Sequence, residues 1–107
     1  MSNKLRIMIS QPMRGKTNEQ IRKEREELVK RLEKDNFEVV DTIIAENAPK
    51  GCNEAIYYLS KSIEFISKAD IVYFMKGWEE ARGCKIENKI CQDYGKQTMY
   101  DIYEEGE

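Results

Sequence analysis

Residues 75–95 form the stretch MKGWEEARGCKIENKICQDYG, and the other elements of the chain can be arranged around it. Its composition predicts the end of a buried strand, a loop that contains glycine, and a helix that begins near Gly83. In open α/β sheets, ligands bind at such strand-to-helix loops, outside the carboxyl ends of the strands. Glu87 falls in the expected first turn of the helix, where the helix dipole favours an ionised carboxylate. Such a group suits a nucleophile or an anchor for a sugar hydroxyl, although glutamate is also common in first turns without any function.

Strand and helix signals alternate along the whole chain. Strands are expected over Leu5–Ser10, Phe37–Ile44, Ile71–Met75 and Gln97–Tyr103, and helices from Thr17 to about Asp35, from Asn53 to before Asp70, and from Gly83 to Gly95. This alternation predicts an α/β fold whose parallel sheet of four to five strands has helices on both faces. Because crossovers between parallel strands are right-handed, the expected strand order is 2-1-3-4.

Local signals predict where the helices begin and end, and which faces are buried. Thr17 and Gln20 form a capping box, and Asn53 is a favourable N-cap. Asn36 and Gly95 are suited to the left-handed conformation that ends a helix. The positions expected to face the core are Ile21, Leu28, Val29 and Leu32 in the first helix, Ile56, Leu59, Ile63 and Ile66 in the second, and Ile86, Ile90 and Cys91 in the third.

The loops that follow the first and third strands, Gln11–Gly15 and Lys76–Gly83, are expected to meet in one crevice where the strand order reverses. Arg14, close to a helix N-terminus, suits an anion, or is an ordinary surface arginine. Trp78 can stack on a planar base, cover the edge of the core, or lie in a subunit interface. Gly83 lets a ligand approach the backbone closely, or simply starts the helix. No phosphate-binding GxxxxGK[ST] or dinucleotide-binding GxGxxG motif is present.

Composition limits the classes of protein that the chain can belong to. A length of 107 residues predicts a single domain, residues 1–107. A net charge of -2 with both signs intermixed argues against a nucleic-acid-binding protein. No apolar run approaches the length of a membrane span, and the N-terminus lacks the layout of a signal peptide. Three cysteines without a CxxC motif favour reduced thiols, so we expect a cytoplasmic location.

The absence of histidine restricts the chemistry further. It excludes Ser-His-Asp and Cys-His catalysis within one chain. It also argues against a zinc site, because neither Cys₄ nor Cys₂His₂ spacing is available. We therefore expect no metal site. Acid-base or nucleophilic chemistry must use carboxylates, tyrosine, lysine or cysteine.

Two motifs resemble a known family. Gly83-x-x-x-Glu87, followed by a helix ending in Tyr94-Gly95, is similar to the signature of the nucleoside 2-deoxyribosyltransferase superfamily, which includes the 2′-deoxynucleoside 5′-phosphate N-hydrolases. The sequences QPMRG at 11–15 and KGWEEARGC at 76–84 resemble a short branch of that superfamily found in phages and bacteria. The resemblance covers nearly the whole chain.

The resemblance implies a flavodoxin-like three-layer sandwich, and Glu87 as a nucleophile that attacks C1′ of the sugar. It implies no cofactor, and a homodimer or larger oligomer with sites near the subunit interface. Arg14 and Gly15 match the phosphate-side loop of the hydrolases. The residues expected to bind substrate are Ser10, Gln11, Pro12, Met13, Arg14, Gly15, Asp41, Ser62, Gly77, Trp78, Ala81, Arg82 and Gly83.

Two positions depart from the family pattern. Ser62 stands where the family has an aspartate that assists at the sugar or the leaving base. Ala81 stands where the hydrolases have serine and the transferases aspartate. The neighbouring Arg82 can supply phosphate contacts in place of that serine.

The sequence thus favours a protein that binds a nucleotide or nucleoside and cleaves or transfers its N-glycosidic bond. The alternative from another class is a nucleotide-derivative binder without chemistry, such as a phage accessory protein that sequesters a signal. Ser62 and Ala81 favour this alternative. A third possibility is an interaction module that reuses the fold, because a fold does not determine a function.

Overall fold

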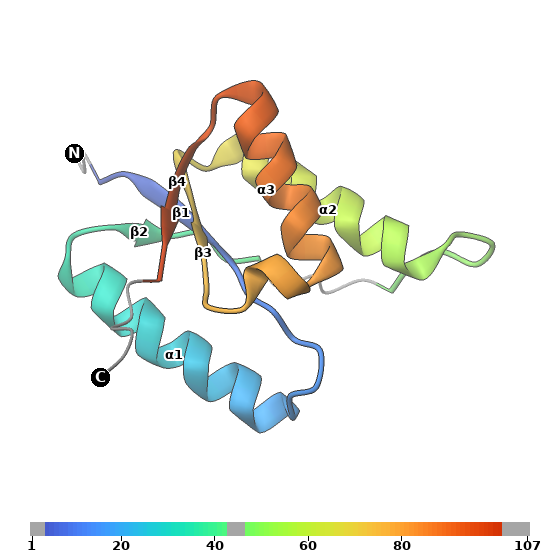
Figure 1. Cartoon of the computed structure of the whole chain (residues 1–107), viewed down its shortest axis with the longest axis horizontal. Helices are drawn as coiled ribbons and strands as arrows, with labels where there is room; N and C mark the ends of the chain where they lie inside the picture. The colour runs from blue at the N-terminus through green and yellow to red at the C-terminus, as the bar shows by residue number, and fades with distance from the viewer. Residues whose placement is uncertain (1–3, 43–46, 102–107) are drawn as a thin grey trace.

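The computed structural model describes residues 4–42 and 47–101 (Figure 1). Within these residues the chain forms one parallel sheet from β1 (Arg6–Ser10), β2 (Glu38–Val39), β3 (Ile71–Phe74) and β4 (Gln97–Tyr100). The strand order is β2-β1-β3-β4, which confirms the order expected from right-handed crossovers. Ser10 pairs with Phe74, so β1 and β3 end at the same level of the sheet.

Three α-helices connect the strands in the described part of the chain: α1 (Asn18–Lys34), α2 (Glu54–Lys68) and α3 (Arg82–Tyr94). The capping box is present, because the Gln20 backbone N–H donates to Thr17 Oγ1 (3.1 Å) and the Thr17 N–H donates to Gln20 Oε1 (2.8 Å). Asn53 Oδ1 accepts from the first turn of α2. Asn36 (φ 73°) and Gly95 (φ 70°) take the left-handed conformation just after α1 and α3.

Helices cover both faces of the sheet, as Figure 1 shows, with α1 on one face and α2 and α3 on the other. Because successive strand residues point to opposite faces, two apolar clusters form. The α1 cluster contains Ile7, Ile9, Leu28, Leu32, Ile71, Tyr73 and Met75, and the α2–α3 cluster contains Met8, Ile66, Ala69, Val72, Phe74 and Cys91. The fold is therefore the flavodoxin-like, Rossmann-like three-layer sandwich.

Two sequence-based expectations about the elements are wrong. β2 covers only two residues instead of 37–44, because regular pairing with β1 does not continue beyond the bond from the Val40 N–H to the Ile7 carbonyl. Residues 43 and 44, and the expected end of β4 at 102–103, lie outside the described residues. The inward stripes are narrower than predicted, since Ile56, Ile63 and Ile86 are 64%, 38% and 38% exposed. The N-terminal half of α2 extends past the sheet in Figure 1, which leaves Ile56 without a core to face.

A polar network joins β3, the end of β4 and α1. The Tyr73 hydroxyl donates to Asp101 Oδ1 (2.6 Å) and accepts from Arg31 Nη2 (2.7 Å). Asp101 Oδ2 also accepts from the Lys76 backbone N–H at 2.6 Å. Burial, followed by the neighbouring Asp101 carboxylate, raises the pKa of Tyr73 to about 12. The protonated hydroxyl thus links three elements at the carboxyl edge of the sheet.

We predict that Tyr73→Phe lowers the free energy of unfolding by about 1–3 kcal/mol, because it removes two hydrogen bonds to charged groups, those with Asp101 and Arg31. The raised pKa means that the contribution of Tyr73 is complete below its ordinary value of 10.0 and is lost as pH rises towards 12. The difference in the free energy of unfolding between wild type and variant, measured with urea, should become smaller as the pH rises across this range. Tyr94→Phe, at a side chain that is 85% exposed, is the control and should change nothing. A difference in the free energy of unfolding that does not vary with pH would contradict this role of Tyr73.

Candidate functional site

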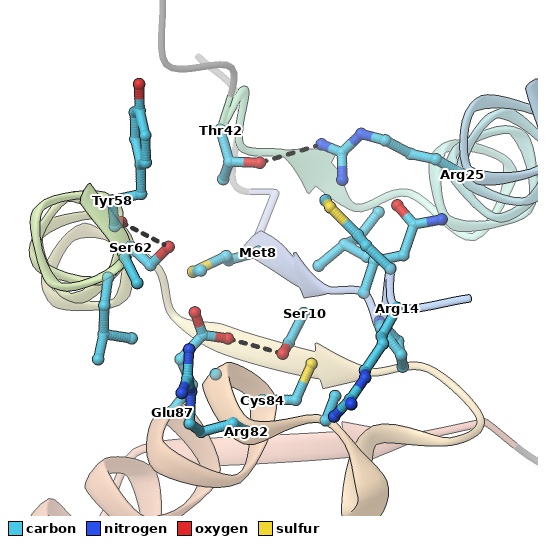
Figure 2. A pocket seen from close by; sticks show the side chains of 18 residues that line it. Met8, Ser10, Arg14, Arg25, Thr42, Tyr58, Ser62, Arg82, Cys84 and Glu87 are labelled. Atoms are coloured by element: carbon cyan, nitrogen blue, oxygen red, sulfur yellow. Dashed lines mark hydrogen bonds between the residues drawn. The ribbon is translucent and has the colours of Figure 1, made fainter. Parts of the chain in front are cut away.

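A cavity of about 720 Å³ opens at the carboxyl ends of β1 and β3, between α1, α2 and the start of α3 (Figure 2). The described residues that line it come from five segments. They are Met8, Ile9, Ser10, Gln11, Pro12, Met13 and Arg14 from β1 and its loop, Arg25 from α1, Thr42 after β2, Ala55, Tyr58, Leu59 and Ser62 from α2, and Ala81, Arg82, Gly83, Cys84 and Glu87 around the start of α3. The switch point between β1 and β3 thus holds the cavity that this class of sheet is expected to have there.

Glu87 points into the cavity from α3, and its side chain is only 7% exposed. Ser10 at the end of β1 donates from its hydroxyl to Glu87 Oε1 at 2.7 Å, a buried hydrogen bond between residues 77 positions apart. In Figure 2 the Ser62 side chain on α2 points towards the same region, although its hydroxyl donates to the Tyr58 carbonyl at 3.3 Å. The carboxyl is thereby held in one orientation facing the cavity.

The expected place of Glu87 in the first turn is wrong, and so is the expectation that the helix dipole sets its proton affinity. α3 begins at Arg82, so Glu87 lies in its second turn, beyond the first turn where the helix dipole acts. Burial raises the pKa of Glu87 above its ordinary value, and the hydroxyls of Ser10 and Ser62 counteract this only in part. Desolvation therefore dominates the proton affinity of Glu87. A raised pKa beside a cavity is typical of functional carboxyl groups, although structural groups show it too.

Arginines surround the cavity. Arg14 and Arg82 are exposed, and neither forms an ion pair with a carboxylate among the described residues. Arg25 is half-buried, donates to Thr42 Oγ1 at 3.4 Å, and interacts electrostatically with Asp41. Burial lowers the pKa of Arg25 and Asp41 opposes this, but an arginine remains protonated at neutral pH. The rim is therefore cationic around a single buried carboxyl.

The structure brings most of the predicted site residues to this cavity. Ser10, Gln11, Pro12, Met13, Arg14, Ser62, Ala81, Arg82, Gly83 and Glu87 all line it. Gly15, Asp41, Gly77 and Trp78 do not. Trp78 lies in a short 3-10 helix, η1 (Trp78–Glu80), and packs against Phe74 and Tyr100 with ring centroids 5.4 and 5.6 Å apart. Of the three roles open to Trp78, the structure shows the one at the edge of the core.

Several lining residues were not predicted from the sequence: Met8, Ile9, Arg25, Thr42, Ala55, Tyr58, Leu59 and Cys84. Strand alternation puts Met8 on the face of Ser10, and the spacing of residues 55, 58, 59 and 62 puts them on one face of α2. The sequence pattern could therefore have predicted that Met8 and these α2 residues line the cavity. Arg25 lies among many charged residues of α1, and nothing in the sequence separates it from them.

Within residues 4–42 and 47–101, no group of three or more histidine, cysteine, aspartate or glutamate residues can hold a metal ion. In the same part of the chain, no helix has both the length and the apolar character needed to span a membrane. The cysteines Cys52, Cys84 and Cys91 are free thiols. The side chains that line the cavity offer carboxyl, hydroxyl, amide, thiol, phenol and guanidinium groups.

The fold and the cavity define a doubly wound α/β protein with a buried carboxyl at its switch point. The family model described as a domain of unknown function, DUF4406, matches residues 5–100, and the chain belongs to this family. No curated protein and no solved structure matches the chain.

We predict that Glu87→Gln raises the free energy of unfolding at neutral pH. A carboxyl whose pKa is raised on folding contributes stability below its ordinary value of 4.5, and that contribution is lost as pH rises. The amide keeps an oxygen for Ser10 and carries no buried charge. In thermal unfolding, the variant should therefore melt at a higher temperature than the wild type at neutral pH, and this difference should disappear near pH 4. Glu80→Gln, at an exposed position in η1, is the control. A variant less stable than wild type by the same amount at both pH values would contradict the assignment.

Proposed function

We propose that the protein binds a nucleotide or nucleoside in this cavity and cleaves or transfers its N-glycosidic bond, with Glu87 as the nucleophile. The observation that carries the proposal is the buried carboxyl of Glu87, fixed by Ser10 and facing a cavity with a cationic rim. The resemblance of the Gly83-x-x-x-Glu87 and QPMRG motifs to the deoxyribosyltransferase superfamily supports it independently of the geometry. The three free thiols agree with a cytoplasmic setting for this reaction.

The proposed chemistry follows from the charge of the reacting centre. As the C1′–N bond breaks, its electron pair leaves with the base and positive charge develops on the sugar. A carboxylate removed from water attracts that charge more strongly than a solvated one, so the desolvation of Glu87 favours the transition state over the ground state. An oxygen of Glu87 then bonds to C1′, and the base takes a proton from solvent. Water or a second base displaces Glu87 and restores the carboxylate.

The test is the release of free base from a panel of deoxyribonucleotides and ribonucleotides, followed by chromatography. Glu87→Gln should lower turnover by at least about a hundredfold, the low end for loss of a key catalytic group. Since the ionised form reacts, kcat/KM should fall on the acid side with an apparent pKa above the ordinary glutamate value of 4.5. Glu80→Gln should retain full turnover. Base release that is unaffected by Glu87→Gln would refute the proposal.

The second candidate is a nucleotide binder without chemistry. It is favoured by two observations. Among the described lining residues Glu87 is the only carboxyl. Ser62 and Ala81 stand where the superfamily that the chain resembles has a catalytic helper and a substrate-selecting group. Such a protein would bind nucleotides tightly and release no base over hours at high protein concentration. In that case Ser62→Asp combined with Ala81→Ser is the variant in which turnover should appear.

Arg14 is proposed to bind a 5′-phosphate, because its guanidinium lies exposed at the rim on the loop before α1. Arg14→Ala should weaken binding of a 5′-phosphorylated ligand by about 1.5–3 kcal/mol, the scale of a hydrogen bond to a charged group. The matching nucleoside should lose far less affinity. Arg22→Ala, at an exposed position on α1, is the matched control for calorimetry. Equal losses for nucleotide and nucleoside would show that Arg14 does not bind the phosphate.

We also propose that the chain assembles as a homodimer or larger oligomer. Support comes from the apolar side chains that α2 and α3 leave exposed, which include Ile56, Ile63 and Ile86. A second copy of the chain is the expected occupant, since the superfamily it resembles has sites near subunit interfaces. Light scattering at micromolar concentration should give at least twice the monomer mass, and Ile56→Asp should reduce it. A strictly monomeric mass for the wild type would contradict this.

A further inference from the structure

Among the described residues, one buried side-chain oxygen at the cavity has no hydrogen-bond partner. Gln11 is 9% exposed and follows β1 directly. Its Nε2 donates to the Ile21 carbonyl of α1 at 2.8 Å, which fixes the orientation of the amide because that carbonyl can only accept. Gln11 Oε1 therefore faces the other way. This oxygen is buried, and it has no hydrogen-bond partner among the described residues.

A buried acceptor without a partner is unfavourable, and most such groups in folded proteins are satisfied. The Gln11 side chain lines the cavity, but its Oε1 has almost no accessible surface, so a ligand contacts this oxygen only when the side chain shifts slightly. A ligand that then supplies a hydrogen-bond donor satisfies the oxygen, whereas a ligand without a donor leaves it unpaired. The unpaired oxygen consequently selects for ligands that carry an N–H or O–H group at this point.

The position of Gln11 separates it from the reacting carboxyl. Ser10 points to the α2–α3 side, where it meets Glu87, whereas the amide of Gln11 contacts α1 on the opposite side. Figure 2 shows Arg25 and Thr42 across the cavity from Glu87, with Met8 and Ser10 of β1 between them. The cavity thus extends over the carboxyl end of β1, and a ligand whose bond to be broken lies at Glu87 has room to reach the α1 side.

Arg25 supplies the complementary group on that side. It lies one turn after Ile21 on α1, hence on the same face as the carbonyl that holds Gln11. Arg25 lines the cavity, and the hydrogen bond from its Nη2 to Thr42 Oγ1, at 3.4 Å, is long. A guanidinium has five N–H donors, so further donors remain for a ligand. The oxygen of Gln11 can accept a hydrogen bond and Arg25 can donate one. Together they match a ligand edge on which an N–H group lies next to a hydrogen-bond acceptor.

We propose that Gln11 is a specificity-determining residue for the nucleobase, whose N–H donates to Gln11 Oε1 while Arg25 donates to the acceptor atom beside that N–H. The pairing edges of the common bases all carry such a donor next to an acceptor, and enzymes that bind unpaired bases recognise them by that edge. The inference rests on the proposed function, because it assigns the base to one part of the same cavity. Beyond the proposed function, the inference names Gln11 and Arg25 as the residues that distinguish an unmodified base from a modified one.

The test uses deoxynucleoside 5′-monophosphates of the four bases, each paired with an analogue whose edge donor is methylated. These analogues are N3-methylthymine, N1-methylguanine, N6,N6-dimethyladenine and N4,N4-dimethylcytosine nucleotides. Calorimetry should show that methylation weakens binding of the preferred nucleotide to the wild type by at least about tenfold, or about 1.4 kcal/mol. Gln11→Met should bind the unmodified nucleotide at least about tenfold more weakly and should no longer distinguish it from the analogue. The melting temperature of the free variant should stay close to that of the wild type, because one hydrogen bond and one unpaired acceptor are removed together.

Each remaining outcome counts against the proposal. Equal binding of the two nucleotides by the wild type would overturn it without any variant. Discrimination that persists in Gln11→Met would show that another group contacts the donor, while leaving the proposed function intact. If no nucleotide of the panel binds the wild type, both the role of Gln11 and the proposed function fail.

Discussion

The hydrogen bond from Ser10 to Glu87 depends on the whole topology of the protein. It joins the end of β1 to the second turn of α3, across 77 positions of sequence and at 2.7 Å. The two groups can meet only because β3 lies beside β1, in a register where Ser10 pairs with Phe74. The parallel pairing brings both strand ends to one level, and the loop through η1 then returns the chain so that α3 passes over them. The carboxyl that defines the cavity is thus a product of strand order, not of any local motif.

The same arrangement explains why Glu87 is both buried and accessible to a ligand. Its neighbours from the sheet side are apolar or weakly polar, and its burial raises its pKa. The hydroxyls of Ser10 and Ser62 offset that cost only in part, and the exposed Arg14 and Arg82 at the rim are solvated and therefore screened. A ligand that fills the cavity and excludes water would strengthen the interactions between these arginines and its own charges. The electrostatic interactions in the site are therefore expected to be strongest when a ligand fills the cavity.

Features with local causes were predictable from the sequence. The capping box at Thr17 and Gln20 and the N-cap at Asn53 depend on side chains within one turn, and the strand order follows from alternation and handedness. Features that depend on tertiary contacts could not be predicted from the sequence. Whether Glu87 is buried depends on how α3 packs over the ends of β1 and β3, where it meets Ser10 from 77 positions away in the sequence. α3 begins at Arg82, close to the expected Gly83, and Glu87 lies in its second turn.

The candidate site shows the same division. The two loops that flank the switch point were predictable, because the ends of β1 and β3 must meet there. The course of the backbone within the loops was not: Gly77 and Trp78 turn towards the edge of the core, against Phe74 and Tyr100. Arg25 reaches the cavity from a helix whose outer surface is almost uniformly charged. Only the packing of α1 on the sheet distinguishes it from its neighbours.

The most direct measurement of the central claim is mass spectrometry of the protein after incubation with 2-deoxy-2-fluoro nucleoside 5′-monophosphates, whose glycosyl-enzyme intermediates break down slowly. The account predicts a sugar phosphate adduct on the peptide that contains Glu87, and no adduct in Glu87→Gln. Binding of the analogue without an adduct, or an adduct on another residue such as Cys84, would contradict the assignment of Glu87 as the nucleophile.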